Sequence, residues 1–151
     1  MERVQDTFLL IGRLLIAALF LTAGIPKAIG LIGRDGAYPG FLQTVTNSGL
    51  PFPEVWAIVG IAIEVLVPIA LILGIFPRIS SLLLIAFVIA ATAIAHRFWA
   101  YPEAQYMAQR GQFLKNIAII GGLLFYYASG PGAWALAGRG ERVGAGAHAR
   151  A

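Results

Sequence analysis

The stretch VWAIVGIAIEVLVPIALIL, residues 55–73, decides the fold class, because Glu64 is the only charged residue among its 19 positions. A helix rises about 1.5 Å per residue, so this run spans roughly 28 Å, close to the ~30 Å hydrocarbon core of a bilayer. Similar runs occupy residues 8–25, 79–95 and 113–128. Backbone groups find no water inside a bilayer, and none of the runs alternates as barrel strands do. All four are therefore predicted to be helices.

The composition agrees with a membrane protein. Apolar residues make up 59% of the 151 positions and charged residues only 12%, against roughly 45–50% and about 25% in soluble domains. The 11 basic and 7 acidic residues give a net charge of +4, scattered along the chain, which argues against nucleic acid as a partner. The chain has no cysteine, which excludes disulfides, thiolate metal sites and dithiol chemistry. Redox work would therefore need a bound cofactor.

Extended by about one turn at their ends, the four runs predict an all-α integral membrane protein, a four-helix bundle. We expect one domain over residues 1–134. Its helices are predicted at about residues 8–28, 54–73, 79–96 and 105–128. The Gly- and Ala-rich residues 135–151 are predicted to form a disordered tail.

The connections suggest how the helices are arranged. Residues 30–54 are rich in Gly and Pro, and their weak amphipathicity predicts a partly interfacial outer loop, either a lid or an interfacial helix, in which Phe41, Leu42 and Val45 enter the headgroup region. Residues 74–78 form so short a link that the second and third helices must be antiparallel neighbours. We expect a multi-pass protein of the bacterial inner membrane with both termini in the cytoplasm, because the two longer loops then face outward together.

Small residues recur four positions apart in the last two runs, which is typical of closely packed membrane helices. The pairs are Ala86 with Ala90, Ala91 with Ala95, and Ala118 with Gly122. We therefore expect these residues to form the seam of the bundle.

Three charges lie inside the apolar runs, Arg13, Glu64 and, near the start of the last run, Lys115. A charge within hydrocarbon costs roughly 2.5–3.5 kcal/mol on insertion scales. Glu64 lies nine residues after Val55, near mid-bilayer, so its carboxyl group must be protonated or paired with a polar group on a facing helix. Arg13 lies about 7–8 Å into the first run, which argues against a cleaved signal peptide. Its side chain either extends back to the headgroups or bridges toward Glu64.

Further polar residues fall at one level, the outer mouth of an antiparallel bundle. They are Lys27, His96, Arg97, Lys115 and Asn116. Each alone fits an interfacial anchor; together, above a buried acid, they suggest a site for a small anion or a quinone-like ring. Our candidate ligand-binding residues are Arg13, Lys27, Glu64, His96, Lys115 and Asn116, with Glu64 and His96 as candidate catalytic groups. One such histidine and one deep acid make no metal-ligand set, so we expect no metal site.

Several motifs, taken in order, resemble those of one family. They are GRLLIAALFLTAGIPK at 12–27, GLPFP at 49–53, LGIFPR at 73–78, AHRFW at 95–99, FLKNIAIIGGLL at 113–124 and GPGAW at 130–134. Together they resemble the DoxX family of small four-helix bacterial membrane proteins. The resemblance gives weight to Arg13, Gly24, Lys27, Gly49, Pro51, Glu64, Gly74, Arg78, His96, Lys115 and Asn116. Many relatives carry Ser and Asp where this chain has Ala135 and Ala137.

The residues and the resemblance together leave two functions of different kinds open. The family is named by likeness to the membrane subunit of a thiosulfate:quinone oxidoreductase, and some members are associated with membrane complexes that handle oxidative or thiol stress. A quinone-binding subunit would use Glu64 as proton acceptor and His96 or Lys115 as donor to a ring oxygen. A non-enzymatic scaffold or chaperone-like partner protein would instead use the buried charges as a polar latch between helices. Whether the chain is an enzyme is left open, and a small transporter is a third, more distant alternative.

Overall fold

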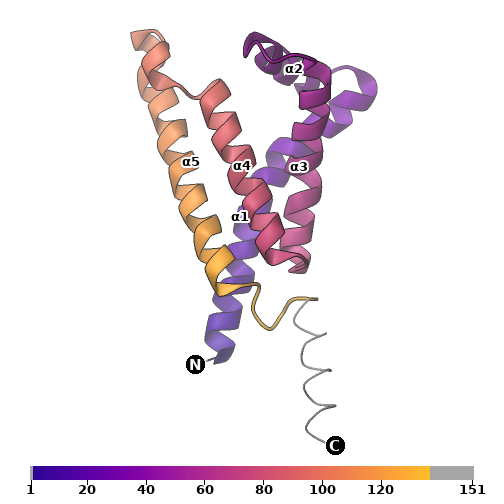
Figure 1. Cartoon of the computed structure of the whole chain (residues 1–151), viewed down its shortest axis with the longest axis vertical. Coiled ribbons are helices and arrows are strands. Elements are labelled where there is room, and N and C mark those ends of the chain that lie inside the picture. The colour runs from indigo at the N-terminus through magenta and orange to yellow at the C-terminus, as the bar shows by residue number, and fades with distance from the viewer. Residues whose placement is uncertain (1, 137–151) are drawn as a thin grey trace, which may run out of the picture.

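The computed structural model describes residues 2–136, and that part of the chain contains five α-helices, one short 3₁₀ turn and no strand (Figure 1). The helices are α1 Glu2–Gly33, α2 Ala37–Asn47, α3 Pro53–Leu73, α4 Pro77–Ala95 and α5 Glu103–Ser129, with the 3₁₀ turn η1 at Phe98–Ala100. The all-α prediction is confirmed. The additional helix is α2, which folds from the connection predicted to be a partly interfacial loop.

Three of these helices are long and apolar enough to cross a membrane, namely α1, α3 and α4. Helix α5 has 27 residues, but its first half is polar. Helix α1 has 32 residues, so at ~1.5 Å per residue it is about 48 Å long and must tilt or extend beyond the hydrocarbon. In Figure 1, α1 runs obliquely behind the other helices.

The α3–α4 connection is a tight turn set by glycine and proline. Helix α3 ends at Gly74, whose φ of 67° is the left-handed conformation common after a helix C-terminus. Pro77 then opens α4, where its missing N–H costs nothing. We call this end of the bundle the turn end and the opposite end, where α2 lies, the α2 end.

Packing joins all the long helices near the turn end and fewer of them near the α2 end. One apolar cluster contains Ala17, Phe20, Leu71, Leu84, Val88, Leu123 and Tyr126, drawn from α1, α3, α4 and α5. A second contains Tyr38, Val45, Ala57 and Ile61, drawn only from α2 and α3, with α1 packed against it. As Figure 1 shows, the α4–α5 pair diverges from α1, α2 and α3 toward the α2 end.

The apolar residues of α2 pack inward. Val45 is buried in the second cluster, and Phe41 and Leu42 lie half-buried against it. Our expectation that Val45 enters the headgroup region was therefore wrong, whereas Phe41 and Leu42 keep part of their surface exposed. The sequence shows only that α2 is amphipathic; α1 and α3 supply the apolar surface that its apolar face covers.

The expected small-residue seam is largely wrong, because α4 has separated from α1 at that level. The alanines at 86, 90, 91 and 95 line a cavity, and Ala118 is exposed. Only Gly122 faces another helix closely: a Cβ added there would lie 3.6 Å from Ile16 of α1. The small side chains of α4 therefore leave space open.

Packed structure continues past the predicted domain boundary at residue 134. Ala135 is buried, and the Leu136 N–H donates to the Leu73 carbonyl at 2.9 Å. The remaining residues of the predicted tail, 137–151, lie outside the described part of the chain.

Candidate functional site

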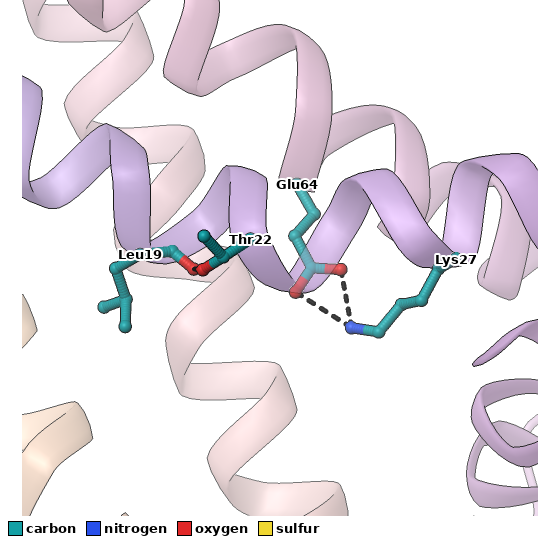
Figure 2. Close-up of polar contacts among 4 residues, drawn as sticks. All are labelled: Leu19, Thr22, Lys27 and Glu64. Atoms are coloured by element: carbon teal, nitrogen blue, oxygen red, sulfur yellow. Dashed lines mark hydrogen bonds and ion pairs between the residues drawn. The ribbon is translucent and has the colours of Figure 1, made fainter.

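The centre of the site is an ion pair between α1 and α3. Lys27 Nζ lies 2.9 Å from Glu64 Oε1 and 2.6 Å from Oε2 (Figure 2). The Glu64 side chain is 6% exposed and that of Lys27 is 20% exposed. Thr22, also on α1, donates its hydroxyl hydrogen to the Leu19 carbonyl at 3.0 Å and not to the Glu64 carboxylate, which Lys27 binds. The mid-helix acid therefore faces a cation inside the protein.

Close approach of α1 and α3 makes this pairing geometry. A Cβ added to Gly24 would lie 3.0 Å from the Glu64 backbone oxygen and 3.0 Å from a Val65 methyl group, so glycine lets the two backbones approach at the level of the pair. Helix α2 completes the surroundings, because Lys27 Nζ lies 4.5 Å from the centre of the Phe41 ring. A cation over an aromatic face is stabilised by the ring quadrupole.

Arg13 lies neither at the headgroups nor beside Glu64, the two positions predicted for its side chain. Its guanidinium is 1% exposed and donates to the Trp134 carbonyl at 3.0 Å near the turn end. The proposed bridge to Glu64 is wrong, because Lys27 holds that carboxylate. Extension into headgroups is also wrong, because the segment after α5 covers the side chain.

The other candidate residues share one cavity with the ion pair. This cavity has a volume of about 810 Å³ and lies between α1, α2 and α3 on one side and α4 and α5 on the other. Lys27, Glu64, His96, Lys115 and Asn116 all line it, and Arg13 does not. Most of the remaining lining is apolar, including the α4 alanines and the rings of Phe41 and Phe87. Gly60 adds room, since a Cβ there would lie 3.2 Å from the Phe41 ring.

Hydrogen bonds orient the polar groups of the α4–α5 side. Asn116 Nδ2 donates to Thr92 Oγ1 at 2.8 Å, and Thr92 donates in turn to the Val88 carbonyl at 2.6 Å. His96 Nδ1 lies 2.8 Å from Gln109 Oε1, so Gln109 engages this ring nitrogen of His96 and not the other, Nε2. Lys115 is exposed and bonds to Gln112 one turn earlier.

Sequence reasoning missed Thr92, Gln109 and Phe41, which orient the candidate residues. Thr92 lies 24 residues from Asn116 in the chain, so only the packing of α4 on α5 brings them together. Gln109 lies 13 residues after His96 and reaches it because η1 turns the chain back. Among the described side chains, residues 3–136, no group of three or more His, Cys, Asp or Glu could hold a metal ion.

These features define a helical integral membrane protein with a buried ion pair at the wall of a mainly apolar cavity. The DoxX family model matches residues 8–97, more than half of the chain, so this chain belongs to the DoxX family, as the motifs predicted. The match includes Arg13, Lys27, Glu64 and His96 and ends before Lys115.

Two relatives from Escherichia coli are similar over most of their length. One, named inner membrane protein YphA, is 30% identical over 132 residues, which cover 87% of this chain and 89% of the relative. The other, named inner membrane protein YqjF, is 27% identical over 136 residues, which cover 90% of this chain and 94% of the relative. No solved structure gives a significant match.

Proposed function

We propose that this chain is a four-span protein of the bacterial inner membrane, with α1, α3, α4 and α5 crossing the bilayer and both termini in the cytoplasm. Three of these helices have the length and apolarity of spans, and α5 packs along α4. The relatives are named as inner membrane proteins. In this arrangement the α2 end faces outward and the short α3–α4 turn faces inward.

Cysteine labelling tests this topology cleanly, because the natural chain contains no cysteine. A cysteine placed at Asn47, exposed at the α2 end, should react with a membrane-impermeant maleimide in intact cells whose outer membrane is permeabilised. A cysteine at Arg78, exposed at the turn end, should react only after lysis. The reverse pattern, or equal labelling of both positions before lysis, would contradict the proposed orientation.

For the activity, we propose that the cavity binds a quinone-like molecule as the membrane subunit of an oxidoreductase or oxidative-stress complex. The cavity itself is the observation that supports this function most directly. Small-molecule sites are typically about 300–1,000 Å³ with apolar walls and few polar groups, and this cavity has about 810 Å³ with such walls. Because Lys27 neutralises Glu64, the charges favour a neutral ligand with hydrogen-bonding oxygens.

The chain's own residues divide the proposed work between them. Gln109 Oε1 accepts from His96 Nδ1–H, so Nε2 of the neutral ring is an acceptor that suits a quinol hydroxyl, and it donates to a quinone oxygen only when both ring nitrogens carry protons. Lys115, at the cavity wall, is the donor available to a quinone oxygen. Glu64, held as a carboxylate by Lys27, is the group that accepts a proton. Electrons for any reduction would come from a partner protein, because the chain itself has no cysteine to supply them.

Quinone content tests this function. Purified protein should retain quinone, measured by solvent extraction and chromatography. Ala91→Phe, which places a ring in the cavity, should lower the quinone-to-protein ratio about tenfold or more, a change of ~1.4 kcal/mol in affinity. Glu64→Gln should also lose the quinone. Ala118→Phe is the matched control, because Ala118 is exposed and does not line the cavity.

Two results would contradict quinone binding. One is wild-type protein that contains no quinone and takes up none when it is supplied. The other is an Ala91→Phe variant that retains as much quinone as the Ala118→Phe variant.

A specific contact also favours the second function, a non-enzymatic scaffold with a polar latch. The Lys27–Glu64 pair ties α1 to α3 through both carboxylate oxygens. In the scaffold function, the ion pair sets the register of α1 against α3, and a partner protein binds the bundle held in that register. Ala91→Phe should then leave the quinone content unchanged.

A further inference from the structure

Arg13 is a buried cation whose hydrogen-bonding capacity is mostly unused. The guanidinium carries five N–H donors and stays protonated at any pH a protein tolerates. One nitrogen, Nη2, donates to the Trp134 carbonyl at 3.0 Å. The other two, Nε and Nη1, are buried and have no acceptor among the described residues. An unsatisfied donor on a buried charged group is strongly unfavourable.

Tyr126 of α5 presents another unused donor at the same place. It is 5% exposed, and its hydroxyl lies close enough to Arg13 for the phenol oxygen to interact with the guanidinium, although it forms no hydrogen bond of ordinary geometry with any described residue. The phenol oxygen can accept one guanidinium N–H, but the arginine cannot accept in return. The remaining N–H groups of Arg13 and the O–H of Tyr126 therefore still lack an acceptor.

No described carboxylate supplies that acceptor. Glu64 is held by Lys27, and Glu54 lies with Arg34 at the α2 end. Asp6, the acid on the turn-end side of α1, accepts the Ala133 N–H at 2.7 Å and forms no ion pair with Arg13. The C-terminal turn of α3, beside Arg13 at Gly74, contributes only the partial negative charge of its carbonyls.

We propose that Arg13 and Tyr126 bind a monovalent anion of halide size, such as chloride, at the turn end of the bundle. The guanidinium donates through Nε and Nη1, and the Tyr126 hydroxyl donates from the α5 side. Packing limits the size of the ion: a Cβ added to Gly74 would collide with both Arg13 Nη1 and Ala135, and Arg13 is 1% exposed. A phosphate or a lipid headgroup does not reach such a position. This site is separate from the cavity that carries the proposed function.

Thermal unfolding in detergent tests the site with chloride and bromide as the probes. Sodium gluconate, whose anion is too large to enter, replaces them at constant ionic strength. The Tm of the wild type should rise with the logarithm of halide concentration once that exceeds Kd, by about 3–5 °C at tenfold excess over Kd. Tyr126→Phe should shift this dependence to about fivefold higher halide concentration, the loss of one hydrogen bond. Tyr127→Phe is the matched control, because Tyr127 is its exposed neighbour.

Ala135→Asp tests the site while leaving Arg13 and Tyr126 in place. Ala135 lies beside Arg13 Nη1 at Gly74, so an aspartate there supplies an internal counter-charge. Its Tm in gluconate should equal or exceed that of the wild type in chloride, with no further halide dependence. Bromide crystals of the wild type should show anomalous density between Arg13 and Tyr126.

Three outcomes would overturn the proposal. Equal Tm values in halide and gluconate would mean that water satisfies the donors. A halide effect that Tyr126→Phe and Ala135→Asp both leave unchanged would indicate an adventitious ion only. A halide-independent Tm that Glu141→Gln lowers would show that a carboxylate of the chain supplies the counter-charge.

Discussion

Lys27→Met should lower the free energy of unfolding by about 3–5 kcal/mol, the usual cost of leaving a buried charge without its partner. Methionine retains most of the apolar side chain of lysine, so the change isolates the ammonium group. The Glu64 carboxylate, 6% exposed, would then have no cation to pair with. Unfolding in a denaturing detergent titration, with the wild type alongside, measures the effect.

Arg34→Met is the matched control for this experiment. Arg34 also pairs with a glutamate, Glu54, but at 3.6 Å and with both side chains more than half exposed. Exposed pairs contribute about 0–1 kcal/mol, so this variant should unfold almost as the wild type does. If Lys27→Met were no more destabilising than Arg34→Met, Glu64 would not depend on Lys27 in the folded protein.

Gly74→Ala should be the second most damaging substitution, at about 2–5 kcal/mol. The left-handed backbone at φ 67° costs a residue with a Cβ about 1–2 kcal/mol. The added Cβ would also collide with Arg13 and Ala135, and overpacking of this kind costs about 1–3 kcal/mol more. The same detergent titration measures the loss.

Gly49→Ala separates the two contributions, because Gly49 has a φ of 79° but nothing within 4 Å of an added Cβ. It should show the backbone cost alone. Equal losses at both positions would mean that Arg13 and residues 133–136 do not pack against Gly74. A larger loss at Gly74, with increased protease sensitivity of the chain after Ser129, supports the packing described here.

The four long helices and the place of the acid within its helix were predictable because each depends on local sequence. Apolar length, Gly74 and Pro77 define α3 and the turn to α4, and the position of Glu64 near the middle of α3 follows directly. The bounds differ most for α1, which continues to Glu2 and Gly33, since polar end turns can be helical without entering the bilayer.

The partner of Glu64 depended on helix register, which local pattern does not give. Arg13 and Lys27 are 14 residues apart, so both lie on nearly the same face of α1. The antiparallel contact of Gly24 with Glu64 sets the level. Lys27 is then one turn from the acid, whereas Arg13 is 11 residues, about 16 Å, from the level of Gly24. A long side chain spans the first distance and not the second.

The cavity could not be predicted because it arises from the divergence of α4 from α1, α2 and α3. Alanines four residues apart are compatible both with a tight helix contact and with an open wall. Which of these occurs depends on the apolar cluster at the turn end and on α2, which holds α1 and α3 together at the other end. The packing of the segment after α5 could not be predicted either, because it depends on Asp6 and Arg13 from the far end of the chain.

A double-mutant cycle on Lys27 and Glu64 tests the ion pair at the heart of the site most directly. The four proteins are the wild type, Lys27→Met, Glu64→Leu and the double variant, compared by their free energies of unfolding. A buried pair at 2.6 Å predicts a coupling of about 2 kcal/mol or more, with the double variant far more stable than the sum of the single losses implies. Losses that add within about 0.5 kcal/mol would contradict the pairing.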